Sequence, residues 1–432
     1  MRTVNVGLVG FGNIGSALAE TLQRDAARLE RSSGVPLKLV RVADRNRGRN
    51  RRSLRDPGIL TTDISKVVRD PGIDVVVELI GGVPDARRIV MGSLAAGKHV
   101  VTANKHLLSE HGGEIVRAAA RRHLLVGFEA AVCGGVPLIK ALREGLIANR
   151  IRHVLGILNG TTNFILTRMS ETGMDYADAL AEAGRLGFAE PDPRLDVDGW
   201  DTAHKASVLA WLIFGQTLPS SRFRVEGIRS ISREDMTAAE RLGCRIKLIA
   251  VLSEEKGRLW LGVHPALVPS VHPLADVRNE FNAVYLEGDL TGPLLFYGRG
   301  AGKKPTVSAV ISDLVDIGAH ILRGERTVIG SVPAVSIRGL SDPGEFKTEY
   351  YLRWKVADEP GMIGRITACL GKAGVNIASV TGAPSGTGLG RVEIVTGLSR
   401  EGQVLKAVKA ADRIPGVRSK GRLLRFERGL VG

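Results

Sequence analysis

A crowded group of carboxylates lies between Gly187 and Lys205. Five acids fall within a dozen positions and one lysine follows them: Glu190, Asp192, Asp196, Asp198, Asp201 and Lys205. The residues after Lys205 are nearly all apolar and predict a buried helix, on which Asp201 and Lys205, four residues apart, share one face. Carboxylates and an ammonium at the mouth of a buried helix suit the binding of an amino group and the movement of one proton. Taken alone, the stretch fits a solvated acidic loop with an ordinary helical ion pair equally well.

The chain around this stretch has 432 residues, of which 44% are apolar, enough for about two to four domains. No apolar run reaches the roughly 18 residues of a membrane span, and a strand predicted at residues 4–9 leaves no room for a signal peptide. Its three cysteines, Cys133, Cys244 and Cys369, match neither a zinc spacing nor a disulfide framework, so we expect a reducing cytoplasm. The net charge of +15 makes nucleic acid a candidate partner. Aromatic residues make up only 4%, however, so we expect a phosphate-bearing cofactor and an anionic substrate instead.

A glycine-rich motif joins the first predicted strand to a helix. GFGNIG follows the apolar run 4–9 and precedes SALAETLQ, which reads as a helix. G-x-G-x-x-G in this place lets backbone N–H groups approach a pyrophosphate at the helix N-terminus. The predicted cofactor contacts in this motif are Gly10, Gly12, Asn13, Ile14 and Gly15.

Charged residues after the second predicted strand bear on which nicotinamide cofactor binds. The strand over residues 38–43 is followed by Asp44, whose carboxylate would hydrogen-bond the ribose hydroxyls of NAD. Guanidinium groups would suit the 2′-phosphate of NADP, and five arginines follow: Arg45, Arg47, Arg49, Arg51 and Arg52. The two signals conflict, and a solvated basic loop accounts for most of these arginines. We favour NADP, with NAD left open and Arg45 as the nearest contact.

Alternating strands and helices through residue 130 predict a doubly wound, parallel α/β domain. Strands are expected at residues 74–80, 99–102 and 124–128, and a helix at 85–96. The carboxyl ends of such strands line the ligand crevice, so we expect the loop from Thr102 to Lys105 to face the cofactor. A second glycine-rich loop, which contains Gly302, leads into a helix predicted at 307–322. That helix could return to the first domain and bring the loop to the cofactor from the other side.

A glycine-rich joint, EAAVCGGVP, runs from Glu129 to Pro137. One carboxylate beside flexible backbone could bind a hard cation through oxygen atoms, and a plain domain hinge is an equally good interpretation. Cys133 is a candidate nucleophile in this joint, but no histidine lies nearby in sequence to activate it. We therefore expect Cys133 to be a small core residue.

The remaining segments predict a mixed central part and a separate C-terminal module. Expected in the central part are strands at 151–158, Arg258–His264 and Ala283–Glu287, and helices at 163–170, capped by AsnGlyThrThrAsn, and Thr237–Ile249. A linker follows at Ser341-Asp342-Pro343-Gly344. The tail then reads as a ferredoxin-like βαββαβ module. Its pieces are Thr348–Val356, Ile363–Ala373, Val375–Thr381, Arg391–Val395, Gln403–Ala411 and Arg418–Phe426.

The acidic stretch closely resembles the signature of homoserine dehydrogenases. The matching positions are Ala183, Gly187, Phe188, Ala189, Asp192, Pro193, Asp196, Gly199, Asp201 and Lys205. GFGNIG, VVELIGG, GKHVVTANK, EAAVCGGVP and GILNGTTNFIL resemble further family segments, and the match covers about residues 1–330. The C-terminal module, with AspGluProGlyMet at 358–362 and GlyValAsnIle at 374–377, looks like an ACT domain.

This resemblance implies the reversible reduction of L-aspartate 4-semialdehyde to L-homoserine with NADPH or NADH. By position in the family pattern, Lys205 and Lys105 are the catalytic lysines. Glu190, Asp196 and Asp201 bind the amino acid or orient the lysine. The chemistry agrees with the residue types, because hydride attack on an aldehyde creates an alkoxide that needs a cation and a proton nearby.

The resemblance also implies a monovalent cation, usually sodium. In the family it is held by the positions that match Glu129 and the backbone carbonyls of Val132, Gly134 and Val136. One departure concerns the cofactor, because many relatives carry an arginine where this chain has Ala43. The resemblance therefore does not decide between NADP and NAD.

The expected architecture has three parts. They are a Rossmann-like dinucleotide-binding domain at 1–130 completed by 301–335, a mixed α/β substrate-binding and dimerisation domain at 131–300, and an ACT regulatory domain at 345–432. A homo-oligomer, dimer or tetramer, is expected because the module leaves one sheet edge open. The resemblance makes threonine the expected effector, held by the loop Asp358–Met362 at a helix start and by Asn376. Truncation after Ser341 is expected to leave an active enzyme that does not respond to threonine.

Two other functions fit parts of the pattern. A nicotinamide-binding regulatory protein could sense an amino acid through its tail without turnover, but it would not need Lys105, Lys205 and Asp196 together. A phosphorylating semialdehyde dehydrogenase would need an activated cysteine, for which the joint offers only Cys133.

Overall fold

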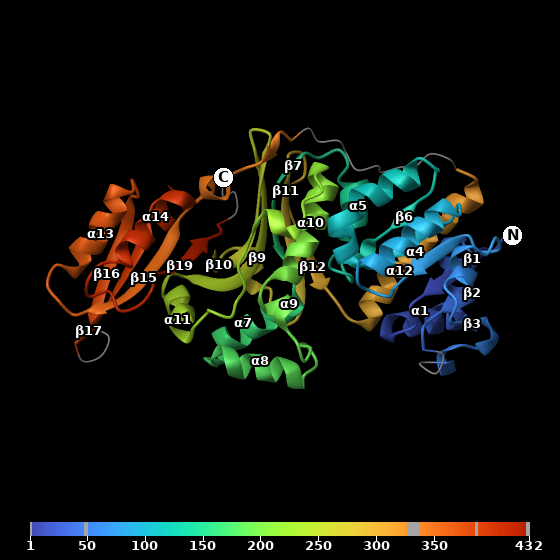
Figure 1. Cartoon of the computed structure of the whole chain (residues 1–432), viewed down its shortest axis with the longest axis horizontal. Coiled ribbons are helices and arrows are strands. Elements are labelled where there is room, and N and C mark those ends of the chain that lie inside the picture. The colour runs from blue at the N-terminus through green and yellow to red at the C-terminus, as the bar shows by residue number, and fades with distance from the viewer. Residues whose placement is uncertain (1, 47–50, 326–336, 385–387, 429–432) are drawn as a thin grey trace.

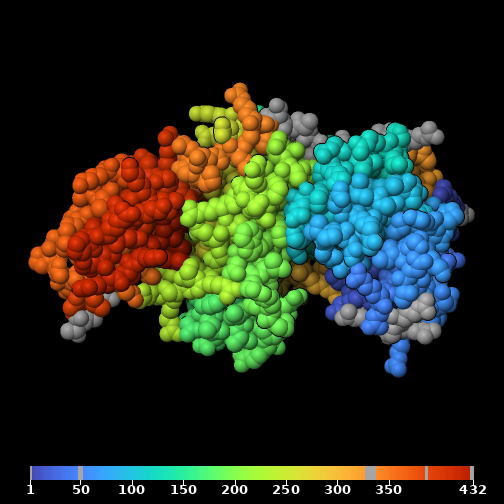
Figure 2. All heavy atoms as spheres, viewed as in Figure 1, coloured from blue at the N-terminus to red at the C-terminus, as the bar shows by residue number. Residues whose placement is uncertain are grey.

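The structure, a computed structural model, describes residues 2–46, 51–325, 337–384 and 388–428. Three bodies follow one another along the long axis of the molecule (Figure 1): an N-terminal sheet with helices, a central sheet flanked by α10, and a C-terminal α/β module. The same order is visible on the filled surface, from blue to red (Figure 2). Helix α12 (Lys303–Arg323) follows the central sheet in sequence but packs back against the N-terminal body.

The N-terminal sheet is parallel, in the order β3-β2-β1-β4-β5-β6. Its strands are β1 (Val4–Val9), β2 (Leu37–Ala43), β3 (Leu60–Thr61), β4 (Val75–Glu78), β5 (His99–Thr102) and β6 (Val126–Gly127). Its helices are α1 (Asn13–Arg24), α2 (Ala26–Ser33), α3 (Ser65–Val68), α4 (Pro84–Ala95) and α5 (Lys105–Ala120). Because the strand order reverses between β1 and β4, the carboxyl ends of these two strands are where a doubly wound sheet binds a dinucleotide. The predicted Rossmann-like fold is confirmed.

Helix α12 is long and apolar enough to cross a membrane, judged by length and composition only. Half of its apolar window is buried inside the protein, and Val310, Leu314 and Ile317 lie in the core that α12 shares with α1 and β1. Gly318 lets the helix approach the sheet, because a Cβ there would lie 2.4 Å from a methyl of Val35. Core packing therefore accounts for the composition of α12.

The central sheet is antiparallel over five strands, in the order β12-β11-β7-β9-β10. They are β7 (Ile151–Ile157), β9 (Cys244–Glu255), β10 (Arg258–Pro269), β11 (Phe281–Gly288) and β12 (Gly292–Arg299). The helices of this part are α6 (Leu138–Lys140), α7 (Gly160–Thr172), α8 (Tyr176–Arg185), α9 (Arg194–Val197), α10 (Trp200–Phe214) and α11 (Arg233–Arg241). Helix α10 is buried along nearly its whole length, as its apolar sequence predicts.

One expectation for the central part is wrong, and one strand was not predicted. The helix predicted at Thr237–Ile249 ends at Arg241, Gly243 follows with a φ of 65°, and β9 begins at the next residue. The run after Gly243 is buried on both sides of the sheet, so its sequence has no period that separates a strand from a helix. Strand β12 has no predicted counterpart, because its glycines and Pro293 read as a loop.

The C-terminal module is the predicted βαββαβ fold, with strands in the order β19-β15-β17-β16. Its elements are β15 (Tyr350–Ala357), α13 (Met362–Lys372), β16 (Ile377–Pro384), β17 (Leu389–Thr396), α14 (Glu401–Ala411) and β19 (Arg422–Phe426). The last strand is shorter than predicted, because it begins at Arg422 and not at Arg418. Strand β19 also pairs with β10, so the central and C-terminal strands join in one sheet (Figure 1). With the short strands β8 (Arg224–Val225) and β13 (Gly339–Leu340), which also pair with β10, this sheet has eleven strands.

Candidate active site

The acidic stretch leads into the start of α10. Asp201 and Lys205 are each 7% exposed, and Lys205 Nζ lies 2.7 Å from Asp201 Oδ2. The Lys205 ammonium also donates to the backbone carbonyl of Leu158 at 2.6 Å. Gly199, with a φ of 87°, turns the chain into α10 and places Asp201 in its first turn. A buried carboxylate–ammonium pair therefore lies at the N-terminal end of this helix.

Lys105 reaches the same carboxylate from the N-terminal body. It is the first residue of α5, which Asn104 caps by accepting from the N–H of Leu107, and its Nζ lies 3.0 Å from Asp201 Oδ1. The Lys105 side chain is 39% exposed. The charge of Asp201 raises the pKa of Lys105, so its ammonium stays protonated. Burial works to raise the pKa of Asp201, but the charges of Lys205 and Lys105 outweigh it and hold that pKa below its usual range.

Asn159 joins this cluster, although the predicted site does not contain it. Its side-chain amide donates to Asp196 at 2.7 Å and to Asp201 at 2.8 Å. Burial first, and then the charge of Asp201, raises the pKa of Asp196. The signal was present in the predicted cap: an asparagine that caps a helix with its oxygen, here toward the N–H of Thr162, keeps two N–H donors for neighbouring carboxylates.

The other acids of the stretch lie closer to solvent. Glu190 is exposed, and its charge is one of those that raise the pKa of the ammonium on α5. Asp192 pairs with Arg194 at 2.5 Å, and Asp198 pairs with Arg229. These two acids of the stretch are thus used in surface ion pairs, whereas Glu190 and Asp196 have no ion-pair partner among the described residues.

Glycines at the end of β1 let the backbone turn tightly into α1. Gly10 has a φ of 100°, and a Cβ there would lie 2.6 Å from the carbonyl oxygen of Leu79. A Cβ on Gly15 would lie 2.1 Å from the carbonyl oxygen of Gly10, so only glycine lets α1 pack this close. A Cβ on Gly12 would meet open space, so a ligand can approach the N-terminus of α1 there.

Comparison with known proteins agrees with this geometry. Residues 10–129 match the family described as homoserine dehydrogenase, NAD binding domain, residues 137–315 match homoserine dehydrogenase, and residues 350–413 match the ACT domain. The homoserine dehydrogenase of Pseudomonas aeruginosa is 40% identical over 96% of this chain and 97% of its own length. This chain belongs to the homoserine dehydrogenase family.

Solved structures of the family support the same assignment. A homoserine dehydrogenase from Thiobacillus denitrificans is 40% identical, covers 99% of both chains and has a TM-score of 0.93. A Staphylococcus aureus homoserine dehydrogenase is 29% identical, covers 99% of this chain and 100% of its own, and has a TM-score of 0.78. The likeness therefore extends over all three bodies of the chain.

Within this family fold, the residues after β2 hold the glycine-rich turn. Asp44 accepts from the backbone N–H of Phe11 at 2.6 Å, which ties the turn to the end of β2. The Arg45 side chain is 81% exposed and pairs with Asp85 at 2.5 Å. Outside the described residues lie Arg47 and Arg49. The choice between NADP and NAD stays a prediction.

Two more predicted cofactor contacts differ in character. Thr102 is buried and donates to Glu78 at 2.7 Å, while its hydroxyl accepts from the N–H of Asn104 at 3.1 Å. Its side chain thus shapes the loop before Lys105, and only the loop backbone remains for a cofactor. Gly302 is the exposed N-cap of α12 with a φ of 116°, so this loop offers backbone groups to a ligand.

Glu129 and the joint after it are the predicted site of a monovalent cation. Glu129 is buried, and its carboxylate accepts the backbone N–H groups of Ile139 at 2.9 Å and Lys140 at 2.7 Å. The Lys140 ammonium pairs with Asp316 at 2.7 Å, so Glu129 has no cationic side-chain partner in the part of the chain that is described. The carbonyls predicted to complete the site are those of Val132, Gly134 and Val136. One buried carboxylate with carbonyl oxygens is a suitable donor set for a hard cation.

Cys133, inside this joint, is not an activated nucleophile. Its side chain is buried and its sulfur accepts from the Asn282 amide at 3.6 Å. Burial raises the pKa of the thiol, which disfavours the thiolate. The expectation of a small core residue is confirmed.

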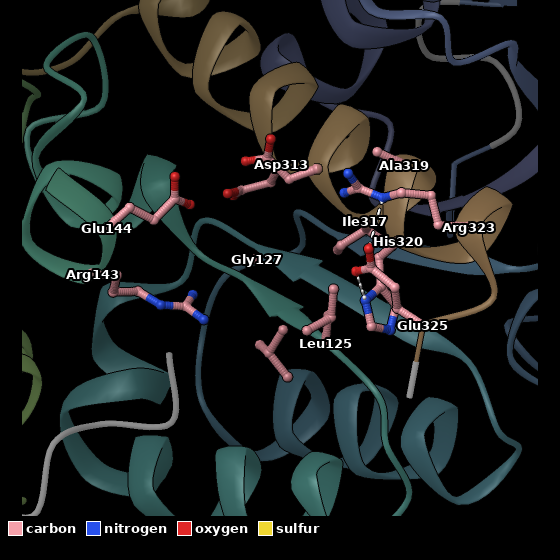
Figure 3. A pocket seen from close by; sticks show the side chains of 12 residues that line it. Leu125, Gly127, Arg143, Glu144, Asp313, Ile317, Ala319, His320, Arg323 and Glu325 are labelled. Atoms are coloured by element: carbon pink, nitrogen blue, oxygen red, sulfur yellow. Dashed lines mark hydrogen bonds and ion pairs between the residues drawn. The ribbon is translucent and has the colours of Figure 1, made fainter. Parts of the chain in front are cut away.

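A polar hollow of about 360 Å³ lies behind the joint, between β6 and α12 (Figure 3). Asp313 of α12 lines it and accepts from the backbone N–H of Glu129 at 2.9 Å. Gly127 makes room, because a Cβ there would lie 2.6 Å from the Asp313 Cβ. Burial, and then the charge of Glu129, raises the pKa of Asp313 well above its usual value. Helix α12 thus fixes the position of the joint.

The C-terminal module has a hollow of its own, of about 530 Å³. The loop from Asp358 to Met362 lines it at the start of α13, together with Gly382–Pro384 at the end of β16. This is the loop predicted to take an effector carboxylate. Asn376 lies at the opposite end of β16 and does not line the hollow.

Proposed function

We propose that the chain catalyses the reversible, NAD(P)-dependent interconversion of L-aspartate 4-semialdehyde and L-homoserine. The observation that carries the proposal is the buried carboxylate of Asp201, held between the ammonium groups of Lys105 and Lys205. A bound nicotinamide coenzyme supplies or accepts the hydride. The protein must supply positive charge and a proton at the substrate oxygen, and the two lysines are the groups in the cluster that can do both.

The two lysines have different surroundings, which supports different roles. Lys205 uses two N–H groups on Asp201 and the Leu158 carbonyl, so it stabilises charge from a fixed position. Lys105 has Asp201 as its only ion-pair partner among the described residues, and it is the more exposed of the two. Lys105 is therefore better placed to exchange a proton with the substrate oxygen, while Asp196 and Glu190 take the substrate ammonium.

Recognition of the ammonium gives a direct test. Homoserine and 4-hydroxybutanoate present the same alcohol, but only homoserine carries an amino group for Asp196. We expect kcat/KM to be at least about 100-fold higher for homoserine, because the analogue has no ammonium group to pair with the Asp196 carboxylate. Asp196→Asn should lower the ratio of kcat/KM for homoserine to kcat/KM for 4-hydroxybutanoate, mainly by raising the KM for homoserine. Equal kcat/KM for the two alcohols would contradict amino-group recognition.

For the coenzyme we favour NADP, with NAD also accepted. Arg45 is an exposed guanidinium directly after the acid at the end of β2, where the adenosine ribose lies in this fold. A hyperthermophilic archaeal homoserine dehydrogenase, 28% identical over 74% of this chain with a TM-score of 0.63, was solved in complex with NADPH. Arg45→Ala should raise the KM for NADPH more than that for NADH. Arg88→Ala, which also removes a partner of Asp85, is the matched control. Equal changes with both coenzymes would make Arg45 an ordinary surface residue.

The assembly and surroundings complete the proposal. Strand β12 has no second neighbour among the described strands of the central sheet, and its Tyr297, which is 53% exposed, offers an apolar surface to a second copy. We infer a dimer or tetramer in the cytoplasm, with sodium at Glu129 and threonine as the effector of the C-terminal hollow. Tyr297→Lys should lower the mass measured by light scattering if this surface is an interface, and an unchanged mass would exclude it.

A further inference from the structure

Two short strands lie one after the other along one edge of β10. Strand β8 (Arg224–Val225) pairs in parallel with Gly262 and Val263, and β19 of the C-terminal module pairs in parallel with Ala266 and Leu267. Residues from the central part and from the C-terminal module therefore meet on the same edge.

A partly buried ion network joins the two strands. Arg425 of β19, 1% exposed, donates to Glu401 at 2.8 and 2.9 Å and to Glu226 at 2.9 and 3.0 Å. Arg224 pairs with Glu226 at 2.5 Å and also contacts Glu401. Two arginines and two glutamates balance, and each body contributes one of each. Burial works to raise the pKa of Glu226, but Arg425 outweighs it and lowers that pKa to about 2, so Glu226 is ionised.

The segment after β8 packs against the acid-bearing turn of the active site. Gly227 touches the turn so closely that a Cβ would lie 2.2 Å from the carbonyl oxygen of Val197. Ile228 donates its N–H to that same oxygen at 2.8 Å. At the other end of the turn, a Cβ on Gly199 would lie 3.3 Å from the carbonyl oxygen of Glu226. The segment Glu226–Ile228 thus contacts both ends of the turn Val197–Gly199.

This turn separates the two acids of the active site. Asp196 is the residue before Val197, and Asp201 is the second residue after Gly199. Asn159 bridges the two carboxylates, so a shift of the turn changes the spacing of the groups that bind the substrate ammonium and orient the lysines.

We propose that Glu226 is a positioning residue of the active site, held in place by Arg425, so that the C-terminal module sets the spacing between Asp196 and Asp201. Glu226 touches neither substrate nor coenzyme and acts through Gly227 and the turn. This rests on the proposed function, because the readout is the KM for homoserine. Strand β19 and the ion pair of Arg425 with Glu226 then connect the module that contains the effector hollow to the active site.

The test compares full-length variants. Glu226→Gln keeps the shape of the side chain and removes its charge, so it should raise the KM for homoserine about tenfold while the coenzyme KM changes less than about twofold. Arg425→Lys, which keeps the charge, should have a KM for homoserine between those of Glu226→Gln and the unchanged chain. The matched control is Arg241→Gln, which breaks a different ion pair between the two bodies, with Glu393 at 2.5 Å, and leaves the turn untouched.

A second variant reaches the turn without the ion network. Gly227→Ala places a methyl against the Val197 carbonyl and should also raise the KM for homoserine more than the KM for the coenzyme. This variant tests the proposal even if Glu226→Gln fails to fold. An unchanged homoserine KM in a folded Glu226→Gln chain or in Gly227→Ala, or an equal rise in Arg241→Gln, overturns the proposal and leaves the network as interface stabilisation only. If the unchanged chain does not oxidise homoserine at all, the proposed function fails before any variant is measured, so the two failures are distinguishable.

Discussion

At the scale of single residues, Asp201 has three side-chain partners: Lys105, Lys205 and Asn159. Replacing a lysine therefore has a catalytic effect and a stability effect of different sizes. We expect Lys205→Ala to lower kcat by at least about 100-fold, because charge stabilisation and proton handling are both affected. It should also lower the free energy of unfolding by roughly 3 kcal/mol, because it leaves a buried carboxylate with one cation fewer.

Lys105→Ala is the natural comparison, measured by steady-state kinetics and urea unfolding. Its loss of kcat should be similar, and its loss of stability smaller, because the Lys105 side chain is more exposed and leaves the buried pair intact. Near-normal turnover in Lys205→Ala would remove this lysine from the mechanism and transfer its role to Lys105.

The two aspartates should titrate apart as the pH falls. Lys205 and Lys105 lower the pKa of Asp201, so its ion pairs stabilise the fold above the usual aspartate range and are lost only as the pH falls through the lowered value. Burial raises the pKa of Asp196, so this carboxylate is protonated earlier. We expect kcat/KM for homoserine to fall at a pH where circular dichroism still shows a folded chain. In Asp196→Asn this acid limb should be absent, and its persistence would assign it to another group.

At the scale of elements, the N-termini of α5 and α10 bring the lysines together, and α12 holds the joint behind them. Asp313 of α12 fixes the N–H of Glu129. Asp313→Ala, which removes this acceptor, should therefore weaken the dependence of activity on sodium more than it changes the KM of either substrate. The measurement is the initial rate as sodium replaces choline at constant ionic strength. Asp316→Asn, which loses the Lys140 pair on the same helix, is the control. Equal sodium dependence in all three chains would contradict a role for Asp313, and activity of the unchanged chain that does not depend on sodium would exclude a cation at this joint.

The strands of the N-terminal sheet and of the C-terminal module are predictable from sequence because they are short, apolar and bounded by glycine or proline. Strand β9 is not, because residues buried on both faces leave no period, and in β12 glycines mask a half-exposed strand. The pairing of β19 with β10 joins segments that lie far apart in the chain, so no local sequence pattern predicts it.

The site shows the same limits. The charge and spacing of Asp201 and Lys205 predicted their pairing, since both lie on one helix. The lysine roles came from family resemblance, and the structure adds that Lys105 shares the same carboxylate. The sequence does not predict Asn159 as a partner of Asp201, because its role as a helix cap already accounts for an asparagine at this position. Its contact with Asp201 appears only when α7 packs against α10.

At the scale of the whole molecule, one continuous sheet runs from the active-site side to the effector hollow (Figure 1). We expect threonine to inhibit homoserine oxidation by the full chain, because an effector acts by favouring one state over another. Ala383→Trp fills the hollow and should abolish the response without changing basal activity. Ala378→Trp, on the same strand but outside the hollow, is its control. A response that survives in Ala383→Trp would place the threonine effect elsewhere.

Truncation after Ser341 is a less specific test of regulation. It removes β19 and uncovers an edge of β10, and it also removes Arg425 from Glu226. We expect the truncated chain to turn over homoserine without a threonine response, but with a raised KM for homoserine. An unchanged KM in that chain would contradict a role for the C-terminal module in placing the acids.

The most direct measurement of the central claim is homoserine-dependent reduction of the nicotinamide coenzyme by the purified full-length chain, followed by absorbance beside Lys205→Ala. The account predicts turnover of L-homoserine with NADP, weaker turnover with NAD, and a loss of at least about 100-fold in the variant. Absence of homoserine-dependent reduction with either coenzyme by a folded chain would contradict it.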